Sequence, residues 1–125
     1  MFKIDLRSSI PIYEQLVQQV KRSIVQGLIK PGDALPSVRK LAASIEVNPN
    51  TVAKAYQELE RQGVIITVRG KGTLVNDIPK TVDTDAAEKM RPLITELIYA
   101  GKTKEEVTDI AAKIYDEIKE GQNNA

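Results

Sequence analysis

Two short helical stretches separated by only a few residues constrain the fold of this chain most strongly. Ser37 is a natural N-cap, and the apolar residues that follow it recur at helical spacing: Val38, Leu41, Ala42 and Ile45. Val47-Asn48-Pro49 then supplies a turn, a cap and a proline suited to the first helical turn. The next helix therefore begins almost at once and extends to Gly63. Two helices joined so closely predict a helix-turn-helix.

The segment before this pair predicts a short strand and one helix. Three apolar residues alternate with charged ones in the pattern of a half-buried strand, namely Phe2, Ile4 and Leu6. Apolar residues then recur every four positions between Pro11 and Gly27, so we expect a helix over residues 11–26. A turn at residues 30–33 and an extended stretch over residues 34–36 complete this segment.

The segment after the pair predicts a β-hairpin. Residues 64–68 form a β-branched run, and a second extended stretch covers residues 73–75. Between them lies the basic, glycine-rich turn Arg69-Gly70-Lys71-Gly72. Three helices followed by such a hairpin are the element order of a winged helix-turn-helix.

The region beyond Pro79 predicts two further helices. The first has an apolar stripe that ends before Gly101, and we expect Pro92 to kink this helix or to delay its start. Residues 103–106, Thr-Lys-Glu-Glu, form a capping box that opens the second helix. We expect residues 122–125 to be frayed. The predicted fold class is therefore mainly α with a small β wing: a winged helix-turn-helix followed by a two-helix hairpin.

The charge of the chain is divided unevenly between these two regions. The formal net charge of +1 argues at first against a nucleic-acid partner. Through Lys80, however, twelve basic residues face seven acidic ones, a net charge of +5, whereas the remainder carries −4. Local charge decides which partner a surface attracts. We therefore predict a nucleic-acid-binding domain at residues 1–78 and a separate helical region at residues 79–125.

Several classes of function are excluded by composition. The chain has no Cys and no His, which removes disulfides, thiolate nucleophiles, imidazole bases and most transition-metal sites. We expect no catalytic residue, no cofactor and no metal site, and therefore no enzyme. The longest run without a charged residue has seven members, far below the ~20 that a membrane helix needs, so we expect a cytoplasmic protein.

The block from Leu35 to Val75 resembles a known family. LPSVRKLAASIEVNPNTVAKAYQELERQGVIITVRGKGTLV closely resembles the DNA-binding domain of the GntR family of bacterial transcriptional regulators. The opening IDLRSSIPIYEQ, the helix VNPNTVAKAYQELE, the wing RGKGTLV and the two-helix tail resemble the short YtrA-type branch. A helix-turn-helix pattern alone is weak evidence for a family. Several matching segments in the same order along nearly the whole chain are specific evidence.

This resemblance implies a set of DNA-contacting residues. The family contacts DNA through its PSxR stretch and the first turns of its recognition helix, and the matching positions here are Ser37, Arg39, Asn50, Thr51, Lys54 and Tyr56. The guanidinium of Arg39 suits bidentate contact with guanine, and Ser37 at a helix start suits a phosphate oxygen. The wing residues fit a tip that approaches the DNA backbone or minor groove, namely Arg69, Gly70, Lys71 and Gly72.

Other interpretations of these residues stay open. Ser37 fits a cap as well as a phosphate contact. Tyr56 lies on the core side of its helix by position, so packing and a phosphate contact are equally supported. The wing turn is also compatible with a solvated hairpin tip. An alternative function is a winged-helix protein-interaction module without specific DNA binding.

The two C-terminal helices predict a homodimer. Each carries a stripe of large aliphatic residues that needs a partner, and the candidate dimerisation residues are Leu93, Ile94, Leu97, Ile98, Val107, Ile110, Ile114 and Ile118. A two-fold dimer would place two reading heads on palindromic double-stranded DNA, as expected for a repressor. Packing of the hairpin on its own N-terminal domain is the alternative. The resemblance also implies control of a transporter operon, and two helices leave little room for a deep small-molecule pocket.

Overall fold

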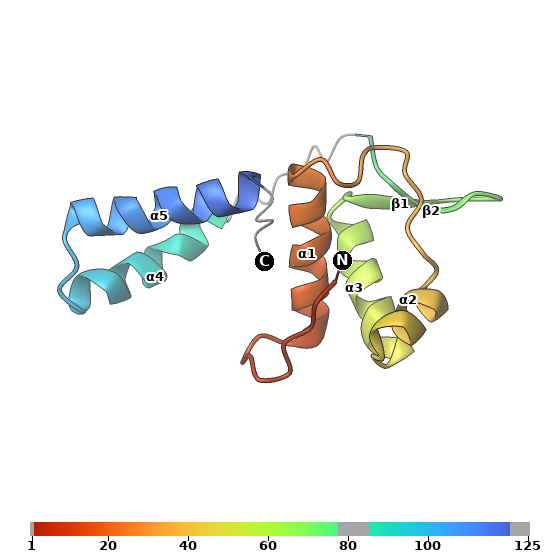
Figure 1. Ribbon diagram of the computed structural model, residues 1–125, viewed down its shortest axis with the longest axis horizontal. Coiled ribbons are helices and arrows are strands. Elements are labelled where there is room, and N and C mark those ends of the chain that lie inside the picture. Colours follow the sequence, from red (N-terminus) through yellow and green to blue (C-terminus); the bar gives the residue numbers. More distant parts are fainter. Residues whose placement is uncertain (1, 78–85, 121–125) are drawn as a thin grey trace. The chain divides into compact units, whose positions relative to one another are not determined.

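Five helices and one two-stranded antiparallel sheet make up residues 2–77 and 86–120, the part of the chain described by this computed structural model (Figure 1). The chain divides into two compact units, Met1–Thr81 and Val82–Ala125. The predicted fold class, mainly α with a small β wing, is confirmed. The predicted boundary at Pro79 and the predicted frayed end at residues 122–125 lie outside the described residues.

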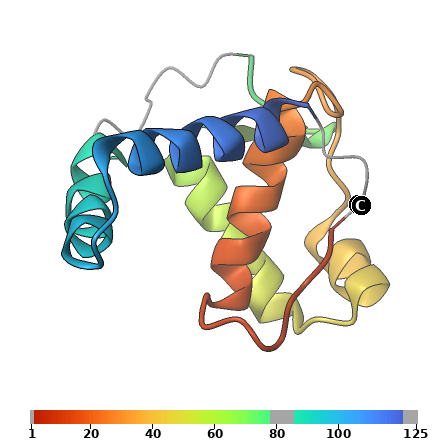
Figure 2. The same cartoon turned by 60° about the vertical axis from the view of Figure 1, so that its left-hand side comes forward.

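The core of the first unit is built around α3 (Pro49–Arg61). This helix packs against α1 (Ile12–Val25), α2 (Val38–Ile45) and β1 (Ile65–Val68), and both views show it beside α1 (Figures 1 and 2). The largest side chains with almost no exposed surface are Leu16, Val20, Val52, Leu59 and Ile65. One face of α3 is thus fully enclosed, which leaves its polar face at the surface.

The helix-turn-helix follows from the capping chemistry in the sequence. The Ser37 hydroxyl accepts a hydrogen bond from the Lys40 amide at 3.1 Å, and the Asn48 side chain accepts one from the Asn50 amide at 2.7 Å. Both caps satisfy amides that have no partner inside their helix. Between the helices, Glu46 adopts a left-handed conformation with φ of 56°, and this turns the chain from α2 toward α3.

Besides its two strands, the wing includes a short extended segment around Ala34, which pairs with β2 (Gly72–Val75) in antiparallel fashion. β1 pairs with β2 in antiparallel register, from Ile65 opposite Val75 to Val68 opposite Gly72. On the outer edge of β2, the Leu35 amide donates to the Thr73 carbonyl and the Val75 amide donates to the Asp33 carbonyl, both at 2.8 Å. The extended stretch that leads into α2 is therefore fastened to the wing.

The predicted strand at the start of the chain is wrong. The segment around Lys3 and Asp5 is not in a sheet but is fastened to α1 by side-chain amides. Gln19 accepts from the Lys3 amide at 2.8 Å and also donates to the Lys3 carbonyl, and Gln15 accepts from the Asp5 amide at 2.9 Å. Of the period-two pattern, Phe2 and Ile4 are half-buried against the core, whereas Leu6 is 81% exposed. The glutamine amides of α1 take the place of the neighbouring strand that a ladder requires.

The second unit consists of α4 (Ala86–Tyr99) and α5 (Lys104–Lys119). The predicted capping box is confirmed: the Thr103 hydroxyl accepts from the Glu106 amide at 3.1 Å, and the Glu106 carboxylate accepts from the Thr103 amide at 2.9 Å. The expected delay of the first helix by Pro92 is wrong, because α4 begins at Ala86 and continues through the proline. An interior proline removes one amide donor and crowds the carbonyl four residues back, and these effects are local enough that α4 begins six residues before Pro92. The alternative, a kink at Pro92, stays a prediction.

Candidate nucleic-acid interface

The residues predicted to contact DNA come from three neighbouring elements of the first unit: the start of α2, the first turns of α3 and the wing. Ser37 and Arg39 are exposed at the start of α2. The stretch before them is held on one side by β2 and on the other by Tyr56 of α3. The positions of Ser37 and Arg39 are therefore tied to both of the other elements.

Tyr56 is enclosed in the protein. Its side chain is 8% exposed, and its hydroxyl donates to the Pro36 carbonyl at 2.6 Å. Burial raises the pKa of Tyr56 to about 12. Like any tyrosine, it carries a single hydroxyl proton at neutral pH, and this proton is already donated to Pro36. A phosphate diester offers only acceptors, so a phosphate contact would require this hydroxyl to leave Pro36. The packing interpretation thus has direct structural support, and the phosphate contact stays a prediction.

The polar face of α3 presents the predicted reading residues. Asn50 and Lys54 are exposed and Thr51 is half-buried, all within the first two turns. The opposite face carries Val52 and Ala55, both 0% exposed. This division orients the first turns of the helix with their hydrogen-bonding groups outward, as groove recognition requires.

The wing tip is exposed at all four predicted residues, Arg69 to Gly72. The Lys71 amide closes the turn by donating to the Val68 carbonyl at 2.9 Å. Gly70 and Gly72 have φ of 83° and 86°, a conformation that L side chains rarely adopt. The glycines therefore shape the turn, and the two cationic side chains extend from it.

One contact beside the reading face was missed by the sequence reasoning. The ammonium of Lys54 lies over the ring of Tyr13, 4.1 Å from its centroid. Desolvation, followed by the Glu14 carboxylate that accepts from its hydroxyl at 3.3 Å, raises the pKa of Tyr13. Nothing local in the sequence indicates this pair, because it depends on how α1 crosses α3.

A carboxylate on the same helix is already committed to other partners. Glu58 accepts from the Arg61 guanidinium Nε at 3.0 Å and from the Gln62 amide at 2.6 Å. These bonds, that of Arg61 first, lower the pKa of Glu58 to about 2. The negative charge of Glu58 is therefore paired within the last turns of α3, beyond the reading residues.

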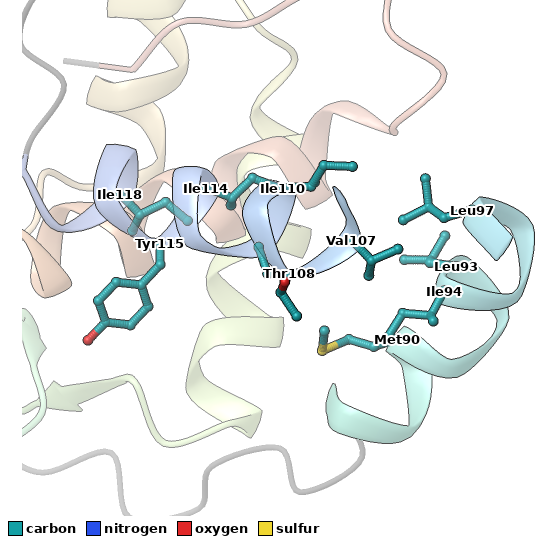
Figure 3. A pocket seen from close by; sticks show the side chains of 11 residues that line it. Met90, Leu93, Ile94, Leu97, Val107, Thr108, Ile110, Ile114, Tyr115 and Ile118 are labelled. Atoms are coloured by element: carbon teal, nitrogen blue, oxygen red, sulfur yellow. The ribbon is translucent and has the colours of Figure 1, made fainter. Parts of the chain in front are cut away.

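The predicted dimerisation residues lie along the second unit. All but Ile98 line an apolar groove of about 600 Å³ between α4 and α5 (Figure 3). No residue in either helix is buried, and Leu93, Ile98 and Ile114 are 65%, 62% and 50% exposed. Within this unit the hairpin thus leaves much of its aliphatic stripe uncovered.

The described residues contain neither a metal-binding cluster nor a membrane-spanning helix. Residues 2–77 and 86–120 contain no group of three or more acidic side chains placed to hold a metal ion. No helix in these ranges is both long and apolar enough to cross a bilayer.

Comparison with known proteins gives concordant results. Residues 12–75 match the family model described as "Bacterial regulatory proteins, gntR family". The HTH-type transcriptional repressor YtrA of Bacillus subtilis (strain 168) is 46% identical to this chain over 129 residues, covering 99% of each sequence. The solved "Transcriptional Antiterminator from Listeria monocytogenes EGD-e" has 42% identity and a TM-score of 0.89, covering 94% of this chain and 92% of that one. The AraR DNA-binding domain, solved in complex with operator ORX1, has 28% identity and a TM-score of 0.53, covering 59% of this chain and 95% of that one.

Proposed function

The chain belongs to the GntR family of bacterial regulatory proteins, in its short YtrA-like branch, and from this premise we propose that it acts as a homodimeric repressor on a palindromic operator. It is a transcriptional regulator and not an enzyme. The observation that carries the proposal is the uncovered polar face at the start of α3, with Asn50 and Lys54 exposed opposite a sealed core. The operator complex of the AraR domain supports DNA as the partner of such a face.

Each exposed group has a distinct part in this proposal. Arg39 reads a guanine through its planar fork, and Asn50, Thr51 and Lys54 meet base edges and phosphates in the major groove. Ser37 contacts a phosphate while it caps α2, since its oxygen has two lone pairs and a proton. The cationic wing tip reaches the backbone or minor groove beside the half-site.

Dimerisation is proposed to occur through the hairpin of α4 and α5. A two-helix unit is near the lower size limit for stability and needs a further apolar surface. An isologous contact would cover the groove of both copies at once and present two reading heads with two-fold symmetry. The net charge of −4 beyond Lys80 favours a role for this unit away from the duplex.

The first experiment selects operator fragments from genomic DNA with the purified protein and then measures binding by anisotropy over a salt series. We expect Arg39→Ala to weaken operator binding about ten- to hundredfold. We expect Lys54→Ala to weaken it and to lower the salt slope, because one cation is lost. Arg22→Ala, an exposed arginine in the last turn of α1, is the matched control. Binding that ignores salt and both substitutions would refute the DNA interface.

The fragments themselves test the finer parts of the proposal. We expect inverted repeats whose half-sites are spaced by about one helical turn of DNA or a multiple of it, near a promoter. A transporter operon downstream and a cytoplasmic location are proposed from the resemblance to the YtrA-type branch. Recovery of fragments without dyad symmetry would contradict the palindrome.

Sedimentation tests the dimer separately. We expect Ile114→Glu to dissociate it, since a carboxylate would enter an apolar contact without a partner. Ala112→Glu adds the same charge on the same helix at a position that does not line the groove, and is expected to leave the dimer intact. Equal sedimentation of both variants with the parent would place the dimer contact elsewhere.

A further inference from the structure

The contact between Lys54 and Tyr13 joins the reading helix to the first turn of α1. Elsewhere these two helices meet through buried apolar residues, such as Leu16 on α1 and Leu59 on α3. Tyr13 is half-buried at the margin of that core, and Lys54 is exposed beside it. The ring therefore reaches from the core to the surface that faces the proposed DNA.

The partner of Lys54 is a ring and not a carboxylate. Of the ion pairs in the described part of the chain, none includes Lys54. Glu58, four residues further along α3, is bonded to Arg61 and Gln62, while Glu14 accepts from the Tyr13 hydroxyl. An aromatic face attracts a cation through its quadrupole but carries no net charge. The ring therefore restricts the position of the ammonium without neutralising it.

We propose that Tyr13 is a positioning residue for DNA recognition. Its ring restricts the ammonium of Lys54 to one position in the interface before DNA binds. This rests on the proposed function, because it requires Lys54 to contact DNA. A lysine side chain free in solution loses rotamer entropy when it is fixed on a partner. Tyr13 imposes part of that restriction before binding, so the bound geometry costs less to reach.

We expect the ring to affect the ratio of operator affinity to non-specific affinity more than the affinity for DNA in general. At a non-specific duplex, any phosphate within reach satisfies a mobile ammonium. At the operator, Lys54 has one correct position, and restriction by the ring favours it. Loss of the ring should therefore weaken operator binding and leave non-specific binding almost unchanged.

The test measures operator and non-specific dissociation constants for Tyr13→Leu, Tyr13→Phe, Lys54→Met and the double variant Tyr13→Leu/Lys54→Met. We expect Tyr13→Leu to weaken operator binding about two- to tenfold, the range for immobilising one long side chain. Tyr13→Phe keeps the ring and should bind as the parent does. In the Lys54→Met background, Tyr13→Leu should have no further effect, because the two residues act through one contact. Unchanged binding of Tyr13→Leu and Tyr13→Phe to the non-specific duplex shows that these two variants are folded. The two variants that lack the Lys54 cation are expected to bind the non-specific duplex more weakly, so far-UV circular dichroism and urea unfolding show that they are folded.

Three results would overturn the inference. Equal loss in Tyr13→Phe and Tyr13→Leu would assign the effect to the hydroxyl. An undiminished effect of Tyr13→Leu in the Lys54→Met background would separate the two residues. Tighter operator binding by Tyr13→Leu would mean that the ring holds Lys54 away from DNA. If Lys54→Met binds the operator as tightly as the parent does, Lys54 does not contribute to operator binding. That result would refute the proposed role of Lys54 and, with it, the inference about Tyr13.

Discussion

Replacement of Tyr56 by phenylalanine removes one hydroxyl that joins α3 to the stretch before α2. The hydroxyl donates to the Pro36 carbonyl at 2.6 Å from a ring that is 8% exposed. A hydrogen bond of this kind contributes about 1 kcal/mol, and the half-buried carbonyl left without a partner adds to the loss. We expect Tyr56→Phe to lower the free energy of unfolding by about 1–2 kcal/mol.

The pH dependence of this difference follows from the pKa of Tyr56, which burial raises to about 12 from the ordinary tyrosine value of 10.0. Below pH 10 the phenol is protonated in both the folded and the unfolded chain, so its full contribution is present. Between pH 10 and about 12 the unfolded chain ionises first, and the contribution of Tyr56 falls as pH rises. The stability gap between parent and Tyr56→Phe should therefore close over this interval.

Urea unfolding followed by far-UV circular dichroism, at a fixed protein concentration, measures both effects. Tyr99→Phe is the matched control, because Tyr99 is 90% exposed, and this variant should unfold as the parent does. If Tyr56→Phe were as stable as the parent at pH 7, the hydroxyl would not be holding Pro36. A gap that stayed constant up to pH 12 would refute the protonated, enclosed state of the ring.

Three further perturbations test the core, a cap and an ion pair of the first unit. Leu59→Ala, at a side chain with 0% exposure, should destabilise the protein by about 2–5 kcal/mol in urea unfolding, and a loss below about 1 kcal/mol would contradict its enclosure. Ser37→Ala should cost about 1 kcal/mol through loss of the cap on the Lys40 amide, whereas Ser37→Asp should retain stability but weaken DNA binding. The pKa of Glu58 is lowered to about 2, so its contribution is present above pH 4.5 and is lost as pH falls toward 2. Glu58→Gln should remove that part of the acid transition, and an identical acid unfolding profile would show that the pair adds nothing.

The local chemistry of the sequence predicted the helix ends well. Ser37, Asn48 and Thr103 cap the helices they were expected to cap, because each bond is made to an amide two or three residues away. Neighbouring residues alone decide such contacts, so their spacing is sufficient evidence. The hairpin was predictable for the same reason, since its turn and strands are contiguous.

The contacts between distant segments were not predictable from spacing. Tyr56 reaches Pro36 twenty positions back, and Lys54 reaches Tyr13 on another helix. Both depend on the angle at which helices cross. The misassigned strand has a similar origin: alternation reveals which side of a segment is buried, but not whether a strand or a helix lies beside it.

The attachment of the first residues to α1 has a consequence for how this protein tolerates change. Gln15 and Gln19 hold backbone atoms of Asp5 and Lys3, not their side chains. Most amino acids offer the same amide and carbonyl, so position 3 is open to substitution in evolution or engineering, whereas a proline there would remove a donor. Position 5 is more restricted, because the Asp5 carboxylate also accepts from the Arg7 amide at 2.9 Å. The polar contacts that hold this segment are thus supplied by two glutamines of a helix, while the segment itself adds the apolar contacts of Phe2 and Ile4 with the core.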